Sequence, residues 1–302
     1  MACDGPRTIT LKNPFIHYDG KLAYSVPVPC GRCGACRKRK VDEWSFRLRQ
    51  QKLVADSAHF VTLTYAPEFC PVTPNKFMTL KRDDITKYFK RLRKWMKDDT
   101  VKLRPFKFYL VGEYGTTTSR PHYHGIFFNA TRDHINEAWC DIRNGQKRAN
   151  RPMLGHVHIG SVTSDSIAYC VKYLDKGRTV PVHNRDDRVR EFSRSSHHLG
   201  ANYLTPAMLR WHRADLSRNY AWNGDYKIAL PKYYRDRIYT KAMKREQWKL
   251  AQAQLEENDY IARKSYFELY PDHTDSDYLL DKEFQKEARY NKYVKHGKKR
   301  KF

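Results

Sequence analysis

The segment RPHYHGIFF, residues 120–128, carries two histidines on either side of one tyrosine. Alternate side chains of a β-strand lie on the same face, so His122 and His124 point the same way, about 7 Å apart along the backbone. Glu113 is the natural third ligand, because it ends the preceding predicted strand and the turn 114–121 can bring its carboxylate beside the histidines. Such a set, with open positions, suits Mn²⁺ or Mg²⁺ acting on a phosphate and would also accept Zn²⁺.

The histidine spacing leaves another interpretation open. Two histidines on one face of a half-exposed strand are also compatible with side chains that are solvated or hydrogen-bonded by their neighbours. A second His-x-His pair, His156 and His158, occurs in the segment HVHIG. Residue type alone does not separate the two pairs.

The segment AYCVKYLDK contains two tyrosines one helical turn apart, each followed after three residues by a lysine: Tyr169, Lys172, Tyr173 and Lys176. On a helical projection, Ile167 and Val171 form an apolar stripe, and the tyrosines and lysines lie away from the face predicted to pack on a sheet. A phenol has a pKa of about 10, and adjacent ammonium groups favour the phenolate. The pattern therefore predicts tyrosine nucleophiles that attack a phosphate, with a surface helix whose tyrosines cover nearby loops as the alternative.

The segment CGRCGAC places Cys30, Cys33 and Cys36 at a spacing that can wrap a soft metal. Cys3 is the first choice for a fourth ligand, and Cys70 is the alternative. Zn²⁺ is favoured over an iron–sulfur cluster, which the spacing does not exclude, and three reduced structural cysteines in a turn are the remaining interpretation. The basic residues that follow are predicted to contact the DNA backbone: Arg37, Lys38, Arg39 and Lys40.

The elements that must position these residues indicate an α+β fold, in which a central antiparallel sheet carries the histidine strand and helices cover one face. Strands are predicted over 59–65, 105–115, 122–130 and 155–163, and helices over 38–55, 80–97, 133–142 and 164–177. Residues 178–202 are predicted to be irregular. We expect three parts: a cysteine-rich N-terminal segment (1–40) with a metal knot, a core (41–205), and a helical extension (206–302) that ends in a disordered basic tail.

The composition indicates a polyanionic partner. The chain has 302 residues and a formal net charge of +25, which predicts salt-dependent attraction to nucleic acid. An anionic membrane is the second choice, but there is no amphipathic anchor and no run of about 20 apolar residues. Seven cysteines, an odd number, argue against a secreted disulfide scaffold, so a cytoplasmic protein is the default expectation.

The segments FVTLTY, EYG…RPHYHGIFF and YCVKYLDK, in this order, resemble the three motifs of the HUH endonuclease superfamily. The two-tyrosine form is similar to the rolling-circle replication initiators of Microviridae, which are small single-stranded DNA phages. VPCGRCGACRKRKVDEW, SRSSHHLGANYL and PKYYRD resemble the gokushovirus-type initiator in particular, and the resemblance extends from about residue 3 to residue 240.

The resemblance implies an HUH-type sheet in which His122, His124 and Glu113 bind the metal. It implies that Tyr169 and Tyr173 are the nucleophiles. Two lysines would assist the reaction or contact DNA, Lys172 and Lys176. The second histidine pair falls outside the metal motif.

The implied function is site-specific nicking and joining of single-stranded DNA through a 5′-phosphotyrosine, which initiates rolling-circle replication of a phage genome. The implied partners are single-stranded or supercoiled origin DNA and the replication helicase and polymerase of the host, in the bacterial cytoplasm and without a membrane. Two alternatives remain: a relaxase or transposase with the same chemistry, and a non-catalytic zinc-containing DNA-binding protein.

Overall fold

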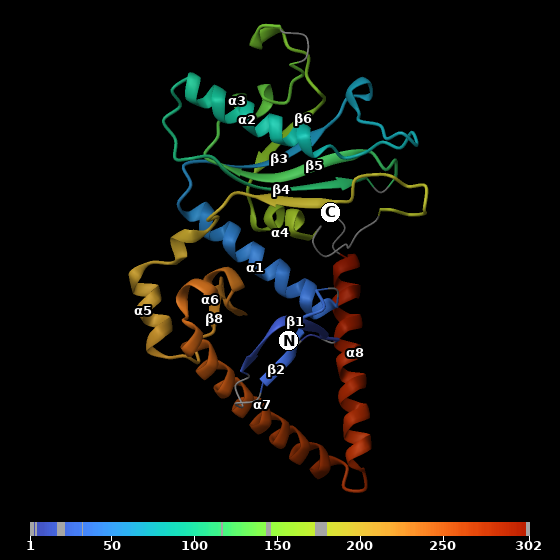
Figure 1. Cartoon of the computed structure of the whole chain (residues 1–302), viewed down its shortest axis with the longest axis vertical. Helices are drawn as coiled ribbons and strands as arrows, with labels where there is room; N and C mark the ends of the chain where they lie inside the picture. The colour runs from blue at the N-terminus through green and yellow to red at the C-terminus, as the bar shows by residue number, and fades with distance from the viewer. Residues whose placement is uncertain are drawn as a thin grey trace. The chain divides into compact units, whose positions relative to one another are not determined.

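The structure is a computed structural model that describes residues 3, 5–16, 22–31, 33–115, 117–142, 146–172 and 180–299 (Figure 1). The chain divides into two compact units. One unit is Val41–Tyr203, and the other combines Met1–Lys40 with Leu204–Phe302. The segments expected as an N-terminal knot and a C-terminal extension therefore fall in one unit.

A five-stranded antiparallel sheet forms the centre of the unit Val41–Tyr203, in the order β6-β3-β5-β4-β7. Its strands are β3 (Ala58–Thr64), β4 (Lys107–Tyr114), β5 (Pro121–Phe128), β6 (Val157–Ser161) and β7 (Phe192–Ser195). The predicted antiparallel pairing of the histidine strand with the strand before it is confirmed. Strand β7 was not predicted, because FSRS is short and mostly polar and its pairing with β4 is long-range.

Helices cover both faces of the sheet rather than the one face expected (Figure 1). Helices α2 (Arg82–Asp98) and α3 (Arg132–Glu137) lie on one side. The apolar stripe predicted for α2 is buried there against side chains such as Tyr123 and Phe127, and it consists of Ile85, Tyr88, Phe89, Leu92 and Met96.

The opposite face is covered by α4 (Ser164–Lys172) and by the part of α1 (Gly34–Leu53) that belongs to this unit. Leu48 and Ile167 pack in one buried cluster with sheet residues such as Val111 and Ile126. Side chains alternate along a strand, so His122 and His124 share this α4 face, while Tyr123 between them is buried on the α2 face.

The other unit contains two antiparallel hairpins and four helices in its described part. The hairpins are β1 (Arg7–Ile16) with β2 (Leu22–Val28) and β8 (Tyr220–Asn223) with β9 (Tyr226–Ala229), and the helices are α5 (Pro206–Ala214), α6 (Lys232–Ile238), α7 (Lys241–Leu269) and α8 (Asp275–Lys299). Neither hairpin was predicted, because many of their residues are exposed and the alternation of apolar and polar residues that marks a half-buried strand is weak.

Helix α8 extends to Lys299, so most of the tail expected to be disordered is helical. Three short 3₁₀ helices complete the secondary structure, η1 (Pro67–Phe69), η2 (Arg148–Asn150) and η3 (Ala201–Tyr203). Among the described residues, no helix combines the length and the apolar character that crossing a bilayer requires.

Candidate functional site

Glu113, His122 and His124 converge on the α4 face of the sheet. Oε1 of Glu113 lies 2.9 Å from Nε2 of His122 and 3.1 Å from Nε2 of His124. One ligand atom from each of the three residues lies within 4.8 Å of the others. The register explains this convergence, because Glu113 on β4 pairs directly with His122 on β5. Paired residues in an antiparallel sheet project to the same face.

Each histidine is oriented by a hydrogen bond at its other ring nitrogen. Nδ1 of His122 lies 3.0 Å from the backbone oxygen of Arg120, and Nδ1 of His124 lies 2.9 Å from the hydroxyl oxygen of Thr62. An imidazole that donates its Nδ1–H in this way keeps the Nε2 lone pair for a metal. The sequence analysis missed Thr62, because only the register of β3 against β5 places it opposite His124.

Burial makes these three residues suitable for a cation. Glu113 and His124 are each 6% exposed, and the His122 side chain is 20% exposed. A carboxylate removed from water is stabilised by a positive charge beside it. The donor set of one carboxylate oxygen and two imidazole nitrogens, with one side open through His122, fits a divalent cation that keeps positions for a substrate.

Tyr169 reaches this site from α4. Its ring centroid lies 5.2 Å from that of His124 and 5.9 Å from that of Phe60, with edge-to-face geometry in both pairs. The helical projection was therefore wrong to place this tyrosine away from the sheet. The apolar stripe through Ile167 and Val171 is buried as predicted, but α4 lies so close to β3 and β5 that a side chain on its flank also contacts the sheet.

The other residues of the tyrosine motif are placed only in part. Lys172 is half-buried and is the last described residue of α4, while Tyr173 and Lys176 lie outside the described residues. Burial, together with the negative charge of Glu113, raises the pKa of the Cys170 thiol, so this cysteine remains neutral and does not compete as a nucleophile.

His158 lies on the same face as the metal-binding candidates. It pairs with Thr62, which pairs in turn with His124, so the three residues form one row across the sheet. His158 is two strands from His124, which corresponds to about 10 Å, and it is exposed. It is too far away to share the same ion, but it borders the surface along which a substrate would leave the site.

The cysteines form a second cluster in the unit that contains the N-terminal segment. One sulfur atom from each of Cys3, Cys30, Cys33 and Cys36 lies within 4.8 Å of the others, and Cys70 is not among them. Helix α1 begins at Gly34, earlier than predicted, so Cys36 lies in its first turn. The basic residues follow in the next turn, where Arg39 and Lys40 are exposed and Arg37 and Lys38 are half-buried.

Comparisons with known proteins identify the family. Residues 58–178, which contain all of the sheet site, match the family model of the replication-associated protein ORF2. The chain is 28% identical to replication-associated protein ORF2 of Spiroplasma virus 4, over 88% of this chain and 85% of that protein. The identity to replication-associated protein VP4 of Bdellovibrio phage phiMH2K is 27%, over 70% of this chain and 67% of that protein.

A third relative is replication-associated protein ORF4 of Chlamydia phage 1, with 23% identity over 70% of this chain and 54% of that protein. No solved structure matches the chain. The chain belongs to the family of phage replication-associated proteins of Microviridae type, as its motifs indicated.

Proposed function

We propose that the protein is a metal-dependent HUH-type DNA endonuclease and strand transferase that initiates rolling-circle replication of a single-stranded DNA phage genome. The observation that carries this proposal is the convergence of Glu113, His122 and His124 beside the ring of Tyr169. The family supports a role in replication, and the site supplies the chemistry.

In this proposal, Glu113, His122 and His124 hold one Mn²⁺ or Mg²⁺ ion. A divalent cation at these ligands would polarise the scissile phosphate and neutralise the charge that develops on it. Thr62 and the backbone oxygen of Arg120 keep the two imidazoles oriented towards the ion.

Tyr169 is proposed as the first nucleophile. Its phenol oxygen attacks phosphorus and loses its proton, the bond from phosphorus to the 3′-oxygen breaks, and the 3′-oxygen takes up a proton. The products are a 5′-phosphotyrosine and a free 3′-hydroxyl, so the reverse attack by a 3′-hydroxyl rejoins a strand without an external energy source. Lys172 would stabilise the phenolate, and Tyr173 would provide the second nucleophile that transfers a strand.

The proposed substrate is single-stranded or supercoiled origin DNA inside the bacterial host, where the helicase and polymerase of the host would extend the free 3′-hydroxyl. The net charge of +25 supports binding to a polyanion. Arg37, Lys38, Arg39, Lys40 and Lys176 are proposed to contribute contacts to the DNA backbone.

The test is a covalent adduct on a denaturing gel after incubation with 5′- or 3′-labelled single-stranded DNA and Mn²⁺. The wild-type protein is expected to retain the label that lies 3′ of the cut, and EDTA or His122→Ala should abolish the adduct. Tyr169→Phe should reduce the adduct strongly. The matched control is Tyr260→Phe on α7, whose side chain is 69% exposed and outside the sheet unit.

The double variant Tyr169→Phe/Tyr173→Phe separates the alternatives. Loss of the adduct with DNA binding retained supports the nickase, whichever tyrosine attacks first. A wild-type protein that binds the DNA but never forms an adduct with any divalent cation would establish the non-catalytic DNA-binding protein instead.

A further inference from the structure

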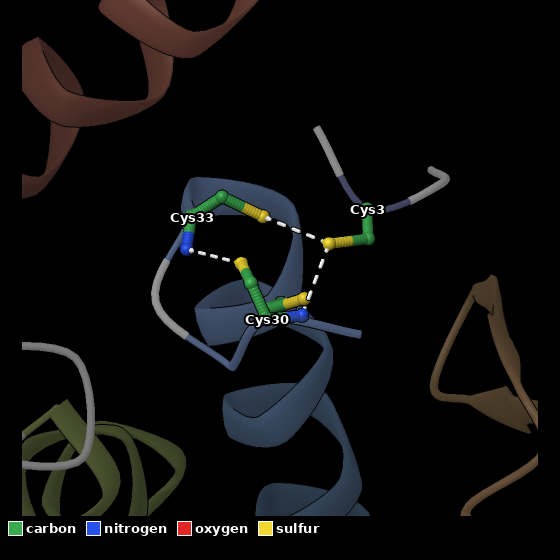
Figure 2. Close-up of side chains that lie close together, drawn as sticks. Cys3, Cys30 and Cys33 are labelled. Carbon is green, nitrogen blue, oxygen red and sulfur yellow. Dashed lines mark hydrogen bonds between the residues drawn. The ribbon is translucent and has the colours of Figure 1, made fainter. Parts of the chain in front are cut away.

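The four clustered cysteines are surrounded by hydrogen-bond donors directed at their sulfur atoms. The backbone N–H of Cys30 donates to Sγ of Cys3 at 3.2 Å, and that of Cys33 donates to Sγ of Cys30 at 3.3 Å (Figure 2). The guanidinium of Arg39 lies 3.6 Å from Sγ of Cys36. A neutral thiol is a weak acceptor, whereas a thiolate is strengthened and oriented by such donors.

The distances between the sulfur atoms indicate a single metal ion. A zinc ion with four Zn–S bonds of about 2.3 Å in a tetrahedron places its sulfur atoms about 3.8 Å apart. The sulfur atoms of Cys33 and Cys3 are 3.9 Å apart, and all four lie within 4.8 Å of one another (Figure 2). A four-iron cluster inserts a cube of iron and sulfide between the thiolates and spreads them further. A disulfide requires about 2.05 Å, and no disulfide links any of the seven cysteines, all of which lie in the described part of the chain.

We propose that Cys3, Cys30, Cys33 and Cys36 bind one structural Zn²⁺ ion that fastens the β1–β2 hairpin to the first turn of α1. Cys3 precedes β1, Cys30 follows β2, and Cys36 belongs to α1, so one ion joins three segments that are separate in the sequence. Four thiolates around Zn²⁺ carry a net charge of −2, and Arg39 offsets part of it. The zinc site is independent of the proposed nicking reaction.

This arrangement assigns the basic turn at 37–40 a specific support. These residues follow Cys36 without a linker, so the ion would hold the start of α1 in place and preserve the spacing of its cationic side chains. The hairpin has little apolar packing of its own, since most of its described side chains are exposed. A metal supplies the stabilisation that such a small element cannot obtain from a core.

The test measures metal content and local protection in the full chain purified without added metal. We expect one zinc per chain by mass spectrometry and four sulfur neighbours at about 2.3 Å by X-ray absorption. Cys3→Ser should lose most of the zinc, whereas Cys70→Ser, which alters the other candidate fourth ligand, should keep it. Cys3→His should retain zinc with one sulfur replaced by nitrogen, since three thiolates and one imidazole also form structural zinc sites.

Hydrogen–deuterium exchange distinguishes a local site from general unfolding. In Cys3→Ser, β1, β2 and the first turn of α1 should exchange faster, while β3, β4 and β5 should remain protected. An absence of stoichiometric metal, an iron content with the visible absorption of an iron–sulfur cluster, or equal zinc loss in Cys3→Ser and Cys70→Ser would each overturn the proposal.

Discussion

Replacing Thr62 by valine tests whether the sheet site is a metal site whose ligands are oriented from behind. The substitution keeps the shape and β-branching of the side chain and removes only the hydroxyl. That hydroxyl lies 2.9 Å from Nδ1 of His124, and the His124 side chain is 8% exposed, so water has little access to take its place.

The size of the effect follows from this geometry. Without the hydroxyl, the Nδ1–H of His124 loses its acceptor, and the tautomer that presents Nε2 towards Glu113 is no longer favoured. Loss of a partner that orients a metal ligand typically weakens metal affinity by 10- to 100-fold, or about 1.4–2.8 kcal/mol. We therefore expect the Kd for Mn²⁺ to rise by about this factor in Thr62→Val.

The assay is calorimetric titration of the DNA-free protein with Mn²⁺, followed by the yield of covalent adduct at limiting and at saturating Mn²⁺. Saturating metal should restore much of the adduct, because Tyr169 is unchanged. The matched control is Thr64→Val on the same strand and face. Thr64 pairs with His122, whose Nδ1 is bonded to the backbone oxygen of Arg120, so this substitution should leave the Mn²⁺ affinity unchanged.

Two results would refute the reasoning. An unchanged Mn²⁺ affinity in Thr62→Val would show that the hydroxyl does not orient His124. Equal weakening by Thr62→Val and Thr64→Val would show that the effect comes from the strand rather than from the hydrogen bond.

Three further predictions concern other parts of the molecule. His158→Ala should weaken binding of single-stranded DNA several-fold in fluorescence anisotropy without altering Mn²⁺ affinity, because the imidazole is exposed on the site's face two strands from the ligands; a change in Mn²⁺ affinity would contradict this. Lys40→Ala should reduce the slope of log affinity against log salt by about one phosphate contact, and an unaltered slope would remove this lysine from the interface. Burial lowers the pKa of His212. As the pH falls below about 6.5, the unfolded chain binds a proton that the folded chain does not. The free energy of unfolding should thus fall by up to about 1.4 kcal/mol per pH unit in denaturant titrations, less so in His212→Gln, whereas exposed His197→Gln should behave as wild type.

Local periodicity in the sequence was sufficient for several features of the site. The two-residue period of a strand placed His122 and His124 on one face, and the period of a helix identified the buried stripes of α2 and α4. Glu113 could be chosen because a single short turn separates its strand from the next. These inferences hold because each depends on neighbours within about ten residues.

The tertiary structure alone decided the features that depend on residues far apart in the sequence. The register of β3 and β6 against β5 brought Thr62 and His158 into the row of His124, and no local pattern marks either residue. The packing distance of α4 turned Tyr169 towards the histidines despite its place on the helical projection. Likewise, the motif at 30–36 announced three thiols, but only folding brings Cys3 to them, because a contact across 27 residues is determined by the path of the hairpin between them.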